Sequence, residues 1–137
     1  VNVLSTVVSG LFDTIGLYSK VGDLQKSLAQ DWLAQVGLAH KANLPLQRLS
    51  FGEQRLVLIC RAMIKQPALL ILDEPCQGLD ESNRHLVLGF IELLAQQQGT
   101  SLLYVTHHLA DILPCFDKRL VCVNVDEELG SEWQIQA

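Results

Sequence analysis

Two short apolar runs constrain the fold of this chain more than any other feature of its 137 residues. The first is the segment ALLIL at 68–72, which is followed directly by Asp73, Glu74 and a proline. The second lies at 101–105 and runs into a threonine and two histidines. Unbroken apolar runs of this length are typical of strands that are buried on both faces of a parallel sheet. We therefore predict two such strands, with a pair of carboxylates at the end of the first.

A helix is predicted between the two strands. Either Asp80 or Ser82 can cap its first turn, and Gly99 can follow its last residue, Gln98. The alternation of helices and strands along the chain is that of an α/β protein, in which a mainly parallel sheet is layered with helices.

The part of the chain before residue 50 is predicted to be helical. Apolar patches alternate with polar spacers from residue 1 to about residue 49. Within this part, the segment 27–36 has helical spacing, and Gly37 can end that helix at its C-cap.

A capping box predicts where the next helix begins. Ser50 and Glu53 stand three residues apart, which is the spacing at which each side chain can bond the other residue's backbone N–H. The helix is expected to begin at Ser50 and to run to about Gln66, because Pro67 cannot continue it.

The C-terminal part is expected to hold a short helix and further strands. The helix should follow the two histidines and end by about Leu113, before a proline. The segments 119–125 and 132–135 favour one or two strands near a sheet edge. No apolar run reaches the about 18 residues that a membrane-spanning helix needs.

Composition excludes some classes of partner and compartment. A formal charge of −5 and a pI near 5.2 argue against nucleic acid as a main partner, because phosphate backbones are bound through clustered Lys and Arg. The cysteines form no C-x-x-C pair and no zinc-ligand spacing, so they are interpreted as reduced thiols of a cytosolic protein with packing roles. They are Cys60, Cys76, Cys115 and Cys122. The opening residues do not resemble a signal peptide, and the chain is taken as a piece of a longer polypeptide.

The carboxylates after the first strand have two interpretations. The carboxyl end of a buried strand is where α/β proteins bind ligands, and in P-loop ATPases an aspartate there holds Mg²⁺. Glu74 can then orient, or take a proton from, an attacking water. The alternative is that Asp73 and Glu74 only cap a turn before the proline.

The segment LSFGEQ at 49–54 also has two interpretations. A capping box begins many helices and needs no function. A helix N-terminus nevertheless offers free N–H groups to a phosphate, and Gly52 lets that phosphate approach the backbone. His107, taken alone, is typical of an ordinary core or surface histidine, and His108 is interpreted as a surface residue.

Together these segments resemble the ABC ATPase family, a P-loop NTPase fold. The segment 49–54 is similar to the family's signature pattern, 70–75 to its Walker B segment, and 76–80 to its D-loop. His107 stands where the family has its switch histidine. The resemblance divides the chain into part of a helical subdomain, residues 1–48, and the distal half of the ATPase core, residues 49–137.

The resemblance assigns one group of residues to a nucleotide held by another protomer. By it, Ser50, Gly52 and Glu53 would contact the γ-phosphate of ATP. Phe51 belongs to the same nucleotide-binding segment but replaces the usual first glycine of the signature, which leaves less room beside the phosphate.

A second group would serve the metal and the reaction. The resemblance implies that Asp73 serves Mg²⁺ through water and that Glu74 is the catalytic carboxylate. Asp80 would cross the dimer interface, and His107 would contact the γ-phosphate and act in catalysis.

The chain departs from the family in one important respect. The pattern G-x-x-x-x-G-K-[ST] occurs nowhere in it, so the backbone cradle and the lysine that hold the phosphates are missing. The glutamine loop is missing too. The chain by itself is expected neither to bind ATP tightly nor to hydrolyse it.

Three functional hypotheses remain open at this point. The first is the distal half of an ATP-hydrolysing subunit that pairs head to tail with a second ABC ATPase domain and drives a membrane-spanning subunit, from a cytoplasmic position on the inner face of the membrane. The sequences of the segments Val7–Gly10, Phe12–Tyr18 and Gln77–Asp80 resemble those of ATPases associated with molybdate uptake. ATPases of metal-chelate importers have similar sequences there. The second is a soluble ABC-type ATP switch without transport. The third is a non-catalytic module, which the intact Asp73–Glu74 pair argues against.

Overall fold

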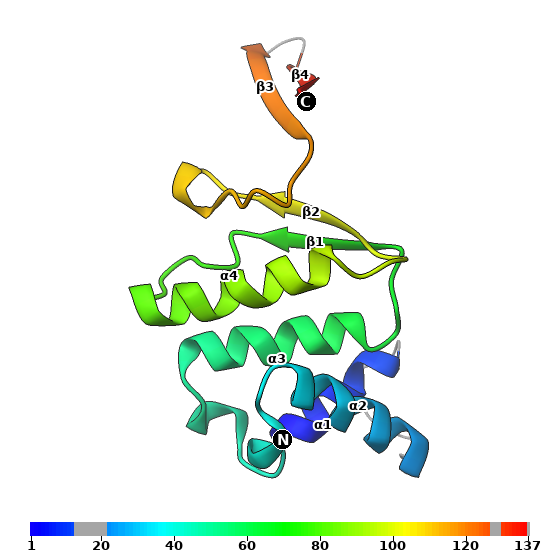
Figure 1. Ribbon diagram of the computed structural model, residues 1–137. Helices are drawn as coiled ribbons and strands as arrows, with labels where there is room; N and C mark the ends of the chain where they lie inside the picture. Colours follow the sequence, from blue (N-terminus) through cyan, green and yellow to red (C-terminus); the bar gives the residue numbers. More distant parts are fainter. Residues whose placement is uncertain (13–21, 127–129, 137) are drawn as a thin grey trace.

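A computed structural model describes residues 1–12, 22–126 and 130–136 of the chain (Figure 1). Residues 13–18 of the segment that resembles molybdate-associated ATPases lie outside the described residues. Helices and strands follow one another in the predicted order. They are α1 (Val3–Val8), α2 (Asp23–Gln35), α3 (Phe51–Met63), β1 (Leu69–Asp73), α4 (Glu81–Ala95), β2 (Ser101–Val105), β3 (Arg119–Asp126) and β4 (Gly130–Gln136).

Strands β1 and β2 form the predicted parallel pair. Their register runs in step, from Leu69 opposite Ser101 to Asp73 opposite Val105. Helix α4 makes the crossover between them, and its first turn is capped by Asp80, whose carboxylate accepts a hydrogen bond from the Asn83 backbone N–H at 2.8 Å. Because the strands are parallel and in register, their carboxyl ends meet at one edge of the sheet.

Only one face of this sheet is buried, so the expectation of burial on both faces is wrong for the described chain. Leu70 and Leu72 face the hydrophobic core. On the other face Leu69 and Ile71 are 51% and 58% exposed. The physical reason is visible in Figure 1, where α4 and then α3 lie on the same side of β1 and β2. No described helix covers the opposite side.

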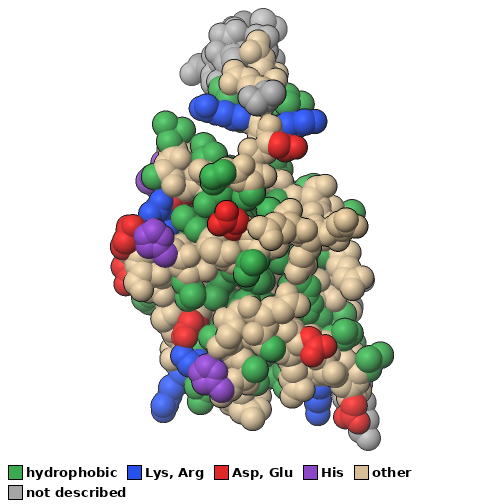
Figure 2. Space-filling view, viewed as in Figure 1, with side chains coloured by type: hydrophobic (Ala, Val, Ile, Leu, Met, Phe, Trp, Pro, Cys, Tyr) green, Lys and Arg blue, Asp and Glu red, His purple; other side chains and the backbone are tan. Residues whose placement is uncertain are grey.

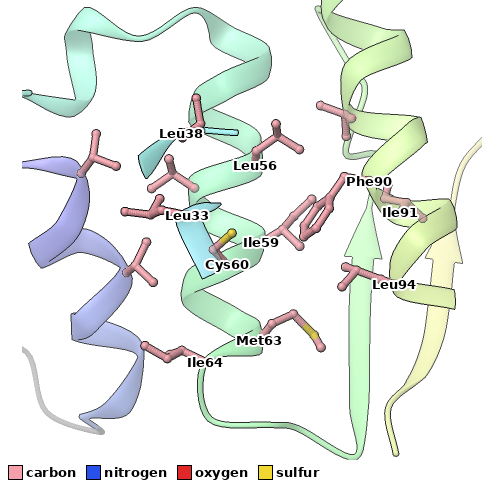
Figure 3. Close-up of a cluster of buried hydrophobic side chains, with 14 of the residues drawn as sticks. Leu33, Leu38, Leu56, Ile59, Cys60, Met63, Ile64, Phe90, Ile91 and Leu94 are labelled. Carbon is pink, nitrogen blue, oxygen red and sulfur yellow. The ribbon is translucent and has the colours of Figure 1, made fainter. Parts of the chain in front are cut away.

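Helix α3 lies at the centre of the core. Its buried side includes Leu56, Cys60 and Met63, which pack between the N-terminal helices and α4 (Figure 3). The capping box is present, with Ser50 as the N-cap residue, as predicted. The helix ends at Met63 rather than near Gln66, because Gln66 takes a left-handed conformation, φ 52°, just before the proline.

The described residues of the N-terminal part are mainly helical, as predicted, and α1 and α2 pack against α3. Helix α2 begins at Asp23, four residues before the expected start, and ends at Gln35. Gly37 follows with φ 73°, a conformation that favours glycine. In α4 the last helical residue is Ala95 rather than Gln98, and Gly99, φ 96°, lies in the turn that leads into β2.

The C-terminal strands do not join the first sheet, which corrects the expectation that they lie near its edge. Strands β3 and β4 pair with each other in an antiparallel hairpin and form a separate two-stranded sheet. In Figure 1 this hairpin projects away from the helices. The short helix after the histidines is a single 3-10 turn, Leu109–Asp111. None of the helices in the described ranges is both long and apolar enough to cross a membrane.

Candidate functional site

The functional side chains gather where β1 and β2 end. Asp73 is the last residue of β1, and Glu74 follows it. Thr106 and His107 follow β2 at the same edge of the sheet. The structure thus brings Glu74 and His107 into direct contact, although 32 residues separate them along the chain.

Glu74 is held in place from several directions. Its backbone N–H donates to the Val105 carbonyl oxygen at 2.8 Å, and its φ of 47° is a left-handed conformation that a glutamate rarely adopts. Its Oε1 accepts a hydrogen bond from the His107 backbone N–H at 2.9 Å and also contacts His107 Nδ1. The Thr106 hydroxyl lies 3.4 Å from Oε2. A carboxylate fixed in this way has one defined orientation toward solvent.

The surroundings of Glu74 favour its ionised form. Partial burial by itself raises the pKa of this carboxyl group. The hydrogen bonds from the His107 backbone and ring, with the charges of His107 and His108, outweigh that effect and lower the pKa below its usual value. Glu74 is therefore a carboxylate at neutral pH and can accept a proton. Asp73, beside it, has an exposed side chain that is open to an aqueous ion.

A second cluster lies at the N-terminus of α3. Ser50 Oγ accepts a hydrogen bond from the Glu53 backbone N–H at 3.1 Å, and Glu53 Oε2 accepts one from the Ser50 N–H at 2.9 Å. Lys41 Nζ lies 2.7 Å from Glu53 Oε1. Partial burial raises the pKa of Glu53, but the bonds to Lys41 and Ser50 together outweigh it and lower the pKa. Phe51, next to this cluster, is exposed.

Asn83 belongs to this cluster, and sequence reasoning missed it. Its Oδ1 accepts hydrogen bonds from Ser50 Oγ at 3.0 Å and from the Gly52 backbone N–H at 3.1 Å. A Cβ added at Gly52 would lie 2.4 Å from the same oxygen. In this structure the glycine therefore makes room for Asn83, where the sequence suggested room for a phosphate. The only signal for Asn83 was its position three residues after the Asp80 cap, in the first turn of α4.

Arg55 is a second residue that sequence reasoning missed. Its guanidinium donates to the Pro75 carbonyl oxygen at 2.9 Å and to the Gln77 carbonyl oxygen at 3.1 Å. It thereby ties α3 to the loop that follows Glu74. The sequence gives no sign of this contact, because an arginine on a helix has the same sequence pattern whether or not a loop lies against it.

Cys60, Cys76 and Cys115 are free thiols, as expected. Cys60 and Cys76 are buried. Burial raises the pKa of the Cys60 thiol to about 12 and also raises that of Cys76. Neither thiol is a nucleophile at neutral pH.

Comparison with known proteins agrees with the fold. A parallel pair of strands with carboxylates at its carboxyl end, layered with capped helices, defines part of an α/β protein of the kind that binds ligands at this edge. Residues 4–77 match the family described as ABC transporter, and the chain belongs to that family.

Several relatives match beyond that segment. The chain is 47% identical, over 86% of its length, to the ABC transporter ATP-binding protein ModF of Escherichia coli, of which it covers 24%. It is 42% identical, over 67% of its length, to the zinc import ATP-binding protein ZnuC of Magnetococcus marinus, of which it covers 35%. An inward-facing metal-chelate type ABC transporter superimposes with a TM-score of 0.78 and 31% identity, over 88% of this chain and 48% of that one. The chain thus spans less than half the length of these relatives.

Proposed function

We propose that the chain is the distal half of an ATP-hydrolysing cassette that pairs head to tail with a second ABC ATPase domain. The observation that carries the proposal is the Glu74 carboxylate, fixed at the shared end of two parallel strands by the backbone and ring of His107. A turn cap alone would not need hydrogen bonds from a histidine that follows the neighbouring strand.

In this proposal the sheet edge carries the chemistry. Glu74 accepts a proton from the attacking water, and His107 orients the carboxylate and contacts the γ-phosphate. Asp73 would hold Mg²⁺ through water. Its carboxylate oxygens are exposed, and oxygen atoms are the ligands that Mg²⁺ prefers. The ion, when bound, supplies positive charge to the phosphates of ATP.

The N-terminus of α3 would serve the nucleotide of the partner cassette. The Ser50 hydroxyl and the Gly52 amide converge on one oxygen atom, Asn83 Oδ1, and in this proposal the same two donors would serve a γ-phosphate oxygen. Phe51 and Glu53 flank these donors. Asp80 caps α4 and would in addition reach across the dimer interface.

The cassette would drive a membrane-spanning transporter subunit that docks on the helical region 1–48, with residues 49–137 carrying the ATPase half. The transported substrate in this proposal is molybdate, a related anion or a metal chelate. Among the relatives, one is named a zinc import ATP-binding protein and one a metal-chelate type ABC transporter, which supports the metal-chelate alternative. The cassette would then lie in the cytoplasm against the inner face of the membrane. Nucleic acid is not expected as a partner, since the net charge is −5 and Lys and Arg do not gather into one patch on the face in Figure 2.

The test is Glu74→Gln in a cassette that joins this chain to a P-loop half. The substitution keeps size and hydrogen-bonding reach but removes the charge, so ATP hydrolysis should fall about 100-fold or more while ATP binding survives. Glu81→Gln is the matched control, because Glu81 also pairs with a histidine, His85, at 2.9 Å but lies on α4. Normal hydrolysis by Glu74→Gln would remove Glu74 from the reaction. The 137-residue chain alone is expected to bind ATP no better than millimolar.

A further inference from the structure

The edge of the first sheet holds a group of metal-ligand atoms that the proposed ATPase chemistry does not use as such. Glu74, His107 and His108 each offer one ligand atom, and these atoms all lie within 4.8 Å of one another. Consecutive residues in an extended chain usually point apart. Here the rings of His107 and His108 lie close together, with centroids 4.2 Å apart and planes inclined by 38°.

Neighbouring groups hold the three ligands in place. The His107 backbone N–H donates to Glu74 Oε1, and the His108 backbone N–H donates to Thr106 Oγ1 at 3.0 Å. The same threonine hydroxyl lies 3.4 Å from Glu74 Oε2. These hydrogen bonds orient the Glu74 carboxylate and fix the backbone that carries the two imidazoles, so the three ligand groups are already close together before an ion arrives.

The ligand set selects the ion. Two imidazoles and one carboxylate are the protein ligands of many zinc sites that keep one coordination position open. Mg²⁺, by contrast, prefers a shell of oxygens and retains much of its water. The His107 side chain is 70% exposed, so an ion can enter from solvent and keep water on its open side.

We propose that Glu74, His107 and His108 form a binding site for Zn²⁺ or a similar divalent transition-metal ion at the carboxyl ends of β1 and β2. The ion binds between Glu74 and His107 in place of their direct contact, and His108 supplies the third ligand. Binding itself does not rest on the proposed ATPase function. Its consequence does: an ion here occupies the carboxylate that would activate water, so the metal inhibits hydrolysis.

The binding test uses the chain itself. Zn²⁺ is titrated into it by calorimetry at pH 7.5 with excess Mg²⁺ present, and we expect one site with a dissociation constant in the micromolar range. His107→Ala and His108→Ala should each weaken binding about 10-fold or more, the scale reached when even the groups behind a ligand are removed. Both side chains are exposed, so thermal melting should show that the variants remain folded.

Two controls separate this site from other ligands in the chain. His85→Ala removes another histidine–glutamate pair, on α4, and should leave Zn²⁺ affinity unchanged. A Co²⁺ spectrum should show ligand-field bands without the charge-transfer band of a thiolate, which excludes the cysteines. The proposal is overturned if Mg²⁺ abolishes binding, if a thiolate band appears, or if the His85 variant loses as much affinity as the His108 variant. None of these outcomes bears on the Glu74→Gln hydrolysis test.

Discussion

The contact between Ser50 and Asn83 gives the sharpest stability prediction. Ser50 Oγ has two roles, since it accepts from the Glu53 N–H as the N-cap of α3 and donates to Asn83 Oδ1 from α4. Ser50→Ala removes both. Asn83→Ala removes the second and also leaves the Gly52 N–H without its acceptor. The two substitutions therefore share one interaction and should not be additive.

The magnitudes follow from the geometry. Loss of the cap costs about 1 kcal/mol. Loss of the hydrogen bond between Ser50 and Asn83 costs about 0.5 to 1 kcal/mol, at the lower end of the usual range because this contact is solvent-exposed. Ser50→Ala should thus lower the free energy of unfolding by about 1.5 to 2 kcal/mol. Ser50→Asp should recover only the cap, because its carboxylate faces the Asn83 oxygen, acceptor against acceptor.

Urea unfolding of the single and double variants measures the shared term. The coupling free energy between Ser50→Ala and Asn83→Ala should be about 0.5 to 1 kcal/mol. Ser27→Ala is the matched control, because Ser27 is an exposed serine within α2, and alanine there should be neutral or slightly stabilising. Additivity of the two variants within about 0.3 kcal/mol would refute the argument.

Two glycines give opposite predictions, because one lies against a neighbouring backbone and the other faces open space. Gly10→Ala should lower the free energy of unfolding by about 1 to 3 kcal/mol or more, because its Cβ would lie 1.9 Å from the Arg61 carbonyl oxygen. Gly89→Ala, in α4 with nothing within 4 Å of its Cβ, should instead stabilise the chain by about 0.5 to 1 kcal/mol in the same urea assay. Equal effects of the two would contradict this account. Cys60 should resist thiol reagents in the folded chain at pH 8, since burial raises its pKa from 9.0 to about 12, and should react only after unfolding. Because folding raises this pKa, stability should fall as pH rises above 9; rapid labelling of folded Cys60 would show that the thiol is accessible.

The sequence was sufficient to predict the order of helices and strands, but not to predict which faces of the strands are buried by helices. β2 has its predicted bounds and β1 begins one residue later than predicted, because an apolar run between helix signals leaves little choice of boundary. The same pattern does not distinguish a strand buried on one face from a strand buried on two. The exposed side chains of Leu69 and Ile71 depend on where the helices lie, which is a property of the tertiary fold.

The site was predictable to the same extent. The meeting of Glu74 and His107 follows from strand order alone, since parallel strands bring the residues after their carboxyl ends to one edge. The Asn83 and Arg55 contacts do not, because each joins segments whose distance is set by the packing of α3 against α4 and the following loop. The local sequence pattern predicts a helix cap at Ser50 but does not predict that Asn83 also bonds the Ser50 hydroxyl.

The shared cap has a consequence for the proposed nucleotide site. Ser50 and Gly52 each offer one proton, and in this structure both protons point at Asn83 Oδ1. A phosphate oxygen that uses the same donors must first displace the asparagine, so its binding is weakened by the free energy of the contact that it breaks. A contact of about 1 kcal/mol corresponds to a loss of affinity of about fivefold. The unfolding cycle on Ser50 and Asn83 therefore measures, on the chain alone, the Ser50 part of the competition that a nucleotide would face at the N-terminus of α3.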